Sequence, residues 1–78
     1  MFETLNQELS DYIKLLRFKS KMSQEETATK LGITRNTYNS WENNPKSLSL
    51  DTLIQIGTIF NEDITNFFKQ YVAESNNN

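Results

Sequence analysis

The chain has 78 residues, a formal net charge of −2, and neither cysteine nor histidine. This length suits a single domain with a modest core, and the missing residue types exclude disulfides and the usual zinc sites. No apolar run approaches a membrane span, and the first residues, MFETLNQEL, lack the basic-then-apolar order of a signal peptide. We therefore expect a cytoplasmic protein without a cofactor or a membrane partner.

The charges are distributed unevenly. Residues 14–46 carry seven basic and three acidic side chains, whereas the rest of the chain carries one basic and seven acidic side chains. A basic centre between acidic ends is a weak form of the footprint of a protein that contacts phosphates. For any single lysine, a solvated surface position is the simpler explanation.

The first segment has apolar residues at the helical period, which predicts a helix from about Thr4 to Lys19. Its expected buried stripe consists of Leu5, Leu9, Tyr12, Ile13 and Leu16. The polar residues Lys19-Ser20-Lys21 close this helix.

Two short capped helices are predicted between Ser23 and Asn43. Ser23 and Glu26 have the spacing of a capping box at the start of the first of these helices. Gly32 supplies a left-handed residue that ends it, and Thr34 can cap the next helix, residues 34–42. Two capped helices joined by a glycine turn have the layout of a helix-turn-helix.

The second helix of this pair has two different faces. Tyr38 and Trp41 recur at i, i+3 and are assigned to the core together with Leu31 and Ile33. The opposite face carries Arg35, Asn36, Asn39 and Ser40. Such side chains suit the hydrogen-bonding pattern of the DNA major groove. The alternative is a solvated helix face, and the presence of four such residues on one surface argues against it.

The remaining sequence predicts a turn at residues 42–46 and two further helices. Ser49 caps a helix from Leu50 to about Phe60, and its inner face is expected to contain Leu50, Leu53, Ile54, Gly57 and Phe60. Glycine inside a helix should lower helix stability by about 1 kcal/mol relative to Ala. We therefore expect that Gly57 is present because it lets a neighbouring helix approach closely.

The last helix is expected from near Asp63 or Ile64 to about Ala73. Its apolar positions are Ile64, Phe67, Phe68, Tyr71 and Val72. Residues 1–74 are assigned to the domain and residues 75–78 to a disordered polar tail. No segment alternates with period two, so the predicted fold is all-α with five helices.

The string MSQEETATKLGITRNTYNSWEN, followed by SLSLDTLIQIGTIFNEDITNFF, resembles the Cro and lambda-repressor type of helix-turn-helix, the XRE family. The resemblance covers about Leu9 to Phe68. It implies a compact, five-helix, lambda-repressor-like bundle. It also implies that Arg17, late in the first helix, pairs with Glu42 at the end of the recognition helix.

The resemblance further implies a DNA-binding site. Arg35, Asn36 and Ser40 match positions that read base edges, and Asn39 lies beside them. Residues matching phosphate contacts are Gln24, Thr34, Asn43, Asn44 and Lys46. Helix capping and turn chemistry alone would explain Thr34, Asn43 and Asn44, and simple exposure to solvent would explain a polar residue at Gln24.

Two features depart from the family pattern. The isoelectric point is about 5.0, and the recognition face has Arg35 as its single cation, so DNA binding by a monomer should be weak or salt-sensitive. Asn44 stands where the usual Trp-Glu-Asn-Gly turn has glycine.

Three functions remain open at this point. The first is a sequence-specific transcriptional regulator of a phage or prophage switch, which binds a double-stranded operator as a homodimer through an aromatic surface on the last helix (Phe67, Phe68 and Tyr71). The second is an antirepressor whose acidic ends bind a repressor protein of the same fold. The third is an antitoxin. We expect neither an enzyme nor a small-molecule substrate, because no nucleophile, metal partner or phosphate-binding glycine loop accompanies Glu25 and Glu26.

Overall fold

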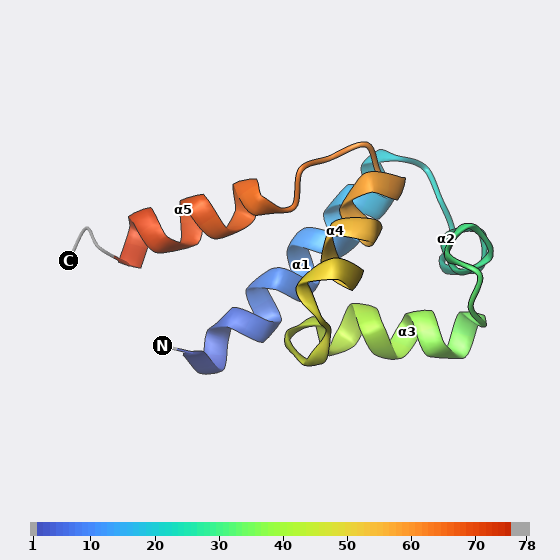
Figure 1. The fold of residues 1–78 in the computed structure, drawn as a ribbon, viewed down its shortest axis with the longest axis horizontal. Helices are drawn as coiled ribbons and strands as arrows, with labels where there is room; N and C mark the ends of the chain where they lie inside the picture. Colours follow the sequence, from blue (N-terminus) through green and yellow to red (C-terminus); the bar gives the residue numbers. More distant parts are fainter. Residues whose placement is uncertain (1, 76–78) are drawn as a thin grey trace.

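The computed structural model describes residues 2–75, which form five α-helices, one short 3-10 helix and no strand (Figure 1). The helices are α1 (Phe2–Lys19), α2 (Gln24–Leu31), α3 (Arg35–Asn43), η1 (Pro45–Ser47), α4 (Leu50–Ile59) and α5 (Thr65–Ser75). The all-α fold predicted from the sequence is therefore confirmed. The expected polar tail begins at Ser75, which the structure includes in α5, and its remaining residues lie outside the described part of the chain.

Local hydrogen bonds set the helix ends, as the sequence predicts. Ser23 and Glu26 form a complete capping box at the start of α2. Gly32 ends this helix in the left-handed region with φ 73°. Thr34 caps α3 and Ser49 caps α4, each by accepting a backbone N–H from three residues further on.

The segment after α3 differs from the plain turn that we expected. The helix continues through Asn43, and Pro45–Ser47 then form the 3-10 helix η1. Proline has no N–H to satisfy and is therefore tolerated at the first position of η1. At the other boundary, the Asp63 carboxylate accepts both the backbone N–H and the hydroxyl of Thr65, so α5 begins at Thr65.

The core lies between α1, α4 and the start of α5. Buried members from α1 are Leu9, Ile13 and Leu16, and those from the C-terminal part are Leu53, Ile56, Phe60, Ile64 and Phe67. Leu5 and Tyr12 pack against this cluster, so the predicted stripe of α1 is confirmed. Burial of such side chains supplies about 1.5–3 kcal/mol each and is the main driving force of the fold.

The predicted inner faces of α4 and α5 need correction. Leu50 and Ile54 of α4 are exposed, whereas Ile56, which the prediction omitted, is completely buried. The buried stripe of α4 is centred on Leu53, Ile56, Gly57 and Phe60, which leaves Leu50 and Ile54 on its edge. Val72 of α5 is likewise exposed, because only the first turns of α5 lie against the core.

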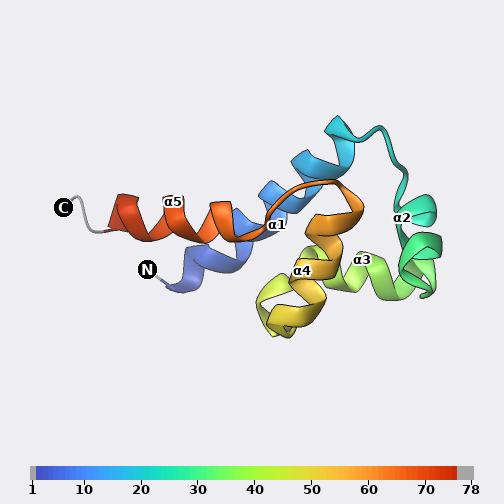
Figure 2. The same cartoon turned by 45° about the horizontal axis from the view of Figure 1, so that its top comes forward.

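α5 lies beside the N-terminal half of α1 and extends away from α2 and α3 (Figures 1 and 2). The contact is aromatic: the ring of Phe67 lies 5.2 Å from that of Tyr12, and Phe68 and Tyr71 surround Phe67. The described chain therefore measures 41 × 22 × 20 Å, with α2 and α3 at the end opposite α5.

Gly57 allows a close approach, as predicted, although the neighbour is the loop before α5 and not a helix. A Cβ at this position would lie 2.9 Å from the Glu62 carbonyl oxygen and 3.2 Å from the Ile64 Cβ. The backbone N–H of Glu62 donates to the Gly57 carbonyl at 2.8 Å and holds the loop in place.

We expect Gly57→Ala to destabilise the protein by about 1–3 kcal/mol, because the overpacking cost exceeds the gain of about 1 kcal/mol in helix propensity. Urea unfolding measures this change. The control is Gln55→Ala, on the exposed side of the same helix, which should change stability by less than about 0.5 kcal/mol. A Gly57→Ala variant as stable as the unsubstituted protein would contradict the close-packing explanation.

Candidate nucleic-acid interface

The exposed face of α3 contains all four residues predicted to read bases: Arg35, Asn36, Asn39 and Ser40. On the opposite face Tyr38 is completely buried, and Trp41 is half-buried against the core. The assignment of Tyr38 to the core is therefore confirmed, and Leu31, Ile33 and Trp41 are each half-buried. α3 presents an unobstructed polar surface from a packed support.

The turn between α2 and α3 gives α3 its direction. The N–H of Gly32 donates to the Thr29 carbonyl, and the N–H of Ile33 donates to the Ala28 carbonyl at 3.0 Å. These bonds satisfy carbonyl groups that the end of a helix would otherwise leave unpaired. α2 and α3 then pack directly against each other (Figure 1).

A buried carboxylate joins α3 to α1. Glu42 is 1% exposed, and it pairs with the guanidinium of Arg17 through Nε to Oε2 at 2.9 Å and Nη2 to Oε1 at 3.2 Å. The ion pair predicted from the resemblance is thus confirmed. Arg17 also donates to the Met22 carbonyl at 3.1 Å, which ties down the chain entering α2.

Two further donors complete the surroundings of this carboxylate. The Tyr38 hydroxyl donates to Oε2 of Glu42 at 2.6 Å, and Gln24 Nε2 donates to Oε1 at 3.1 Å. Tyr38 had been predicted only as a core residue, so its polar role was missed. A hydroxyl four residues before a buried glutamate, at i, i+4 on one helix, is the signal that could have revealed it.

The ionisation of this cluster follows from its contacts. Burial opposes the charged form of Glu42, but hydrogen bonds from Arg17, Tyr38 and Gln24 outweigh it and lower the pKa of this carboxyl from 4.5. Burial and the bond to Glu42 raise the pKa of the Tyr38 hydroxyl. The same carboxylate raises the pKa of Arg17. The network therefore holds Glu42 as an anion and its partners as donors.

The phosphate-contact candidates lie around α3. Thr34 is exposed, but its hydroxyl accepts the Thr37 N–H and donates to the Thr37 hydroxyl, so it acts as a cap. Asn43, Asn44 and Lys46 are exposed at the C-terminal end of α3 and in η1. Gln24 is half-buried, and its Nε2 is bonded to Glu42 and Asn39 within the protein.

Two polar residues of α1 that sequence reasoning missed hold the segment around η1. Asn6 accepts the Lys46 N–H at 3.0 Å and donates to the Asn43 carbonyl at 3.3 Å. The Ser10 hydroxyl donates to the Glu42 carbonyl at 2.6 Å. Asn6, Ser10 and Arg17 share one side of α1, next to its apolar stripe, and this spacing is the signal that was available.

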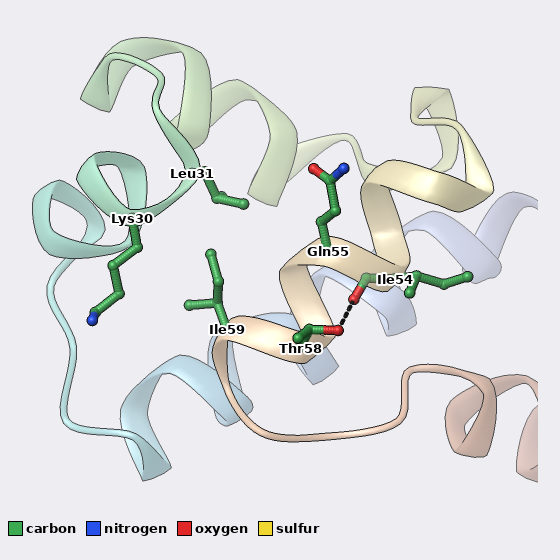
Figure 3. A pocket seen from close by; sticks show the side chains of 6 residues that line it. All are labelled: Lys30, Leu31, Ile54, Gln55, Thr58 and Ile59. Atoms are coloured by element: carbon green, nitrogen blue, oxygen red, sulfur yellow. Dashed lines mark hydrogen bonds between the residues drawn. The ribbon is translucent and has the colours of Figure 1, made fainter.

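A second surface feature is a shallow groove between α2 and α4 (Figure 3). It is lined by Lys30, Leu31, Ile54, Gln55, Thr58 and Ile59. Leu31 and Ile59 point into the same space, and the Thr58 hydroxyl donates to the Ile54 carbonyl of its own helix at 2.8 Å. The groove contains no acid–base or nucleophilic pair.

Residues 2–75 contain no cluster of three or more acidic side chains arranged to hold a metal ion. Within the same range, no helix combines the length and the apolar character needed to cross a bilayer.

Comparison with known proteins identifies the family to which this fold belongs. A family model described as helix-turn-helix matches residues 13–67, which is more than half of the chain. The chain belongs to this helix-turn-helix family, of the XRE type, and the family supports a DNA-binding transcriptional regulator.

A curated relative is the antitoxin HipB of Escherichia coli O6:H1, which is 39% identical over 49 residues, or 63% of this chain. The matched region covers 52% of that relative, so the chain spans about half its length. No solved structure matches the chain.

We expect Glu42→Ala to destabilise the domain by about 3–5 kcal/mol, because it leaves the part-buried Arg17 guanidinium without its carboxylate partner. A double-mutant cycle with Arg17→Ala, measured by urea unfolding, should show strong coupling between the two residues. The matched control is Glu8→Ala, an exposed glutamate on α1, which should cost less than about 0.5 kcal/mol. Additive losses in the double variant would show that the pair is not coupled.

Stability should also fall in acid because of Glu42. Its pKa is lower in the folded than in the unfolded chain, so its contribution is fully present above the unfolded value and is lost as the pH falls through the folded value. Urea unfolding between about pH 7 and about pH 2 measures the loss. Glu42→Gln, which cannot ionise, should show a shallower acid dependence than the unsubstituted protein. An identical acid dependence in the two proteins would show that ionisation of Glu42 does not cause the loss of stability in acid.

Proposed function

We propose that this chain is a sequence-specific transcriptional regulator, acting in a phage or prophage genetic switch, that places α3 in the DNA major groove. The observation that carries the proposal is the exposed polar face of α3 on a packed and hydrogen-bonded support. The resemblance to Cro and lambda-repressor domains favours the switch.

Each residue of the proposed interface has a role that suits its chemistry. Arg35 reads guanine O6 and N7, Asn36 reads adenine, and Asn39 and Ser40 contact base edges on the following turn. Phosphate contacts are assigned to Gln24, Thr34, Asn43, Asn44 and Lys46. For Gln24 the donor is the backbone N–H, because both protons of its side-chain amide are bonded within the protein. The N-terminus of α2, where Gln24 lies, favours an anion.

The regulator acts as a homodimer on an approximately palindromic operator. The half-sites would then lie about one helical turn, 34–36 Å, apart. α5 supplies the proposed contact, although its face differs from the aromatic surface that we expected. Phe67 is buried in the core, whereas Val72 is exposed and borders a shallow apolar groove with Phe68 and Ala73.

Binding to a protein is the second candidate. One observation favouring it is the relative named as an antitoxin, and the groove between α2 and α4 is a candidate surface for such a partner. The antirepressor variant of this hypothesis is supported by exposed acidic residues on α1 and in the loop before α5, namely Glu8, Asp11, Glu62 and Asp63. These charges complement a basic DNA-reading surface on another protein.

We expect the purified protein to enrich a defined sequence from a random duplex DNA library, and Arg35→Ala to weaken binding to that sequence. The expected loss is about 1–3 kcal/mol for a bidentate guanine contact, or roughly 5- to 150-fold in Kd, measured by fluorescence anisotropy. Asn36→Ala should weaken binding similarly.

The matched control is Lys19→Ala, which removes one exposed cation from the end of α1 and should leave sequence preference unchanged. Lys46→Ala should reduce the slope of log K against log salt by about one, without changing the preferred sequence. Absence of any enriched sequence, combined with co-purification of a basic DNA-binding protein, would instead favour the antirepressor hypothesis.

A further inference from the structure

We infer that Asn39 contacts only hydrogen-bond acceptors on DNA, because its own carbonyl oxygen is already occupied. The side-chain amide of Gln24 donates one proton to Glu42 and the other to this oxygen, and we call this link from Glu42 to Asn39 the amide chain. The inference rests on the proposed function and concerns the specificity of the same surface. Three residues carry it: Glu42 as the fixed acceptor, Gln24 as a positioning residue, and Asn39 as the group that meets the base.

The first step is the polarity of the buried carboxylate. Glu42 carries its charge beside Arg17, and an ionised carboxylate only accepts hydrogen bonds. Its Oε1 receives Arg17 Nη2 at 3.2 Å and Gln24 at 3.1 Å. The amide of Gln24 must therefore turn its NH₂ group, and not its oxygen, toward Glu42.

The second step concerns the direction of the hydrogen bond between Gln24 and Asn39 at the surface. The same Nε2 of Gln24 donates its other proton to Asn39 Oδ1 at 3.0 Å. Asn43 Nδ2 approaches the same oxygen at 3.4 Å. A carbonyl oxygen has two lone pairs, so both are engaged, and the NH₂ group of Asn39 remains for an external partner.

The occupied oxygen restricts which bases Asn39 can recognise. Bidentate recognition of adenine needs an asparagine that both accepts from N6 and donates to N7. Asn39 with an occupied oxygen can only donate, which suits guanine O6 and N7 or thymine O4 better than adenine, where N7 accepts but the N6 donor would lack a partner. Asn36 makes no side-chain hydrogen bond with the described residues, so both ends of its amide are available for adenine.

Two nearly isosteric variants test the inference. Asn39→Asp keeps an oxygen for Gln24 but turns a second oxygen outward, so the preferred base at its position should change toward cytosine, whose N4 donates. Gln24→Met removes one of the two donors to the Asn39 oxygen, so this oxygen can accept from adenine N6 and the preference for adenine at that position should rise. Each change should alter the base ratio at that position by about fivefold or more in sequences selected from a random duplex DNA library.

The matched control is Asn36→Asp, which makes the same chemical change three residues earlier. It should alter the base preference at a different position and leave the Asn39 position unchanged. A purely structural role for Gln24 would lower affinity for all sequences alike without altering any preference. Unchanged preferences in Asn39→Asp and Gln24→Met, with normal enrichment, would overturn the inference and leave the proposed function intact.

A measurement on the protein without DNA distinguishes failure of this inference from failure of the proposed function. Both Nε2 protons of Gln24 are hydrogen-bonded, so they should exchange with water at least about tenfold more slowly than the side-chain protons of Asn36 in NMR spectra. Equal rates would overturn the amide chain directly. Slow exchange in a protein that enriches no DNA sequence would overturn the proposed function and the base preference with it, while supporting the amide chain.

Discussion

The buried carboxylate of Glu42 is the constraint on which the exposed polar face of α3 depends. It receives hydrogen bonds from α1, α2 and α3 through Arg17, Gln24 and Tyr38, respectively. Burying one ion costs several kcal/mol, and only the complete set of partners offsets that cost. Apolar packing alone tolerates small rotations of one helix against another. The directional hydrogen bonds to Glu42 therefore fix the angle between α2 and α3 more closely than packing alone would. A polar reading surface needs this precision because base contacts depend on hydrogen-bond geometry.

The parts of the fold that sequence could predict are those determined within a few residues. Ser23, Gly32 and Thr34 act on the backbone of their own helices, so their chemistry is visible without knowing the neighbours. The face of α4 was harder, because apolar residues occur nearly all round that helix. Ile56 and Ile54 are equally apolar, and only the packing of the core cluster decides that the first is buried and the second exposed.

The sequence predicts which side chains of the candidate site are exposed, but not the hydrogen bonds that connect and orient them. Exposure of Arg35 and Asn36 follows from the period of α3 once Tyr38 is placed inside. The contact between Asn6 and the Lys46 backbone joins residues that are 40 positions apart, and one partner is a main-chain group common to every residue type. No sequence pattern identifies such a partner. Gln24 shows the same limit: its position was predicted, but the direction of its amide depends on a carboxylate from another helix.

The charge distribution gives the orienting network a particular importance. Family members that bind operators commonly have a more basic surface, whereas this chain is acidic overall and exposes one cation on α3. Few phosphate contacts mean little sequence-independent affinity, since that affinity comes from counterion release. Under the proposed function, discrimination would then come from base edges and from the joining of two half-sites. Few cations also weaken binding to competing genomic DNA, so a small number of well-oriented amides can yield a useful ratio of specific to non-specific binding. On the proposed function, rigid orientation of side chains such as Asn39 would replace part of the role that positive charge has in more basic family members.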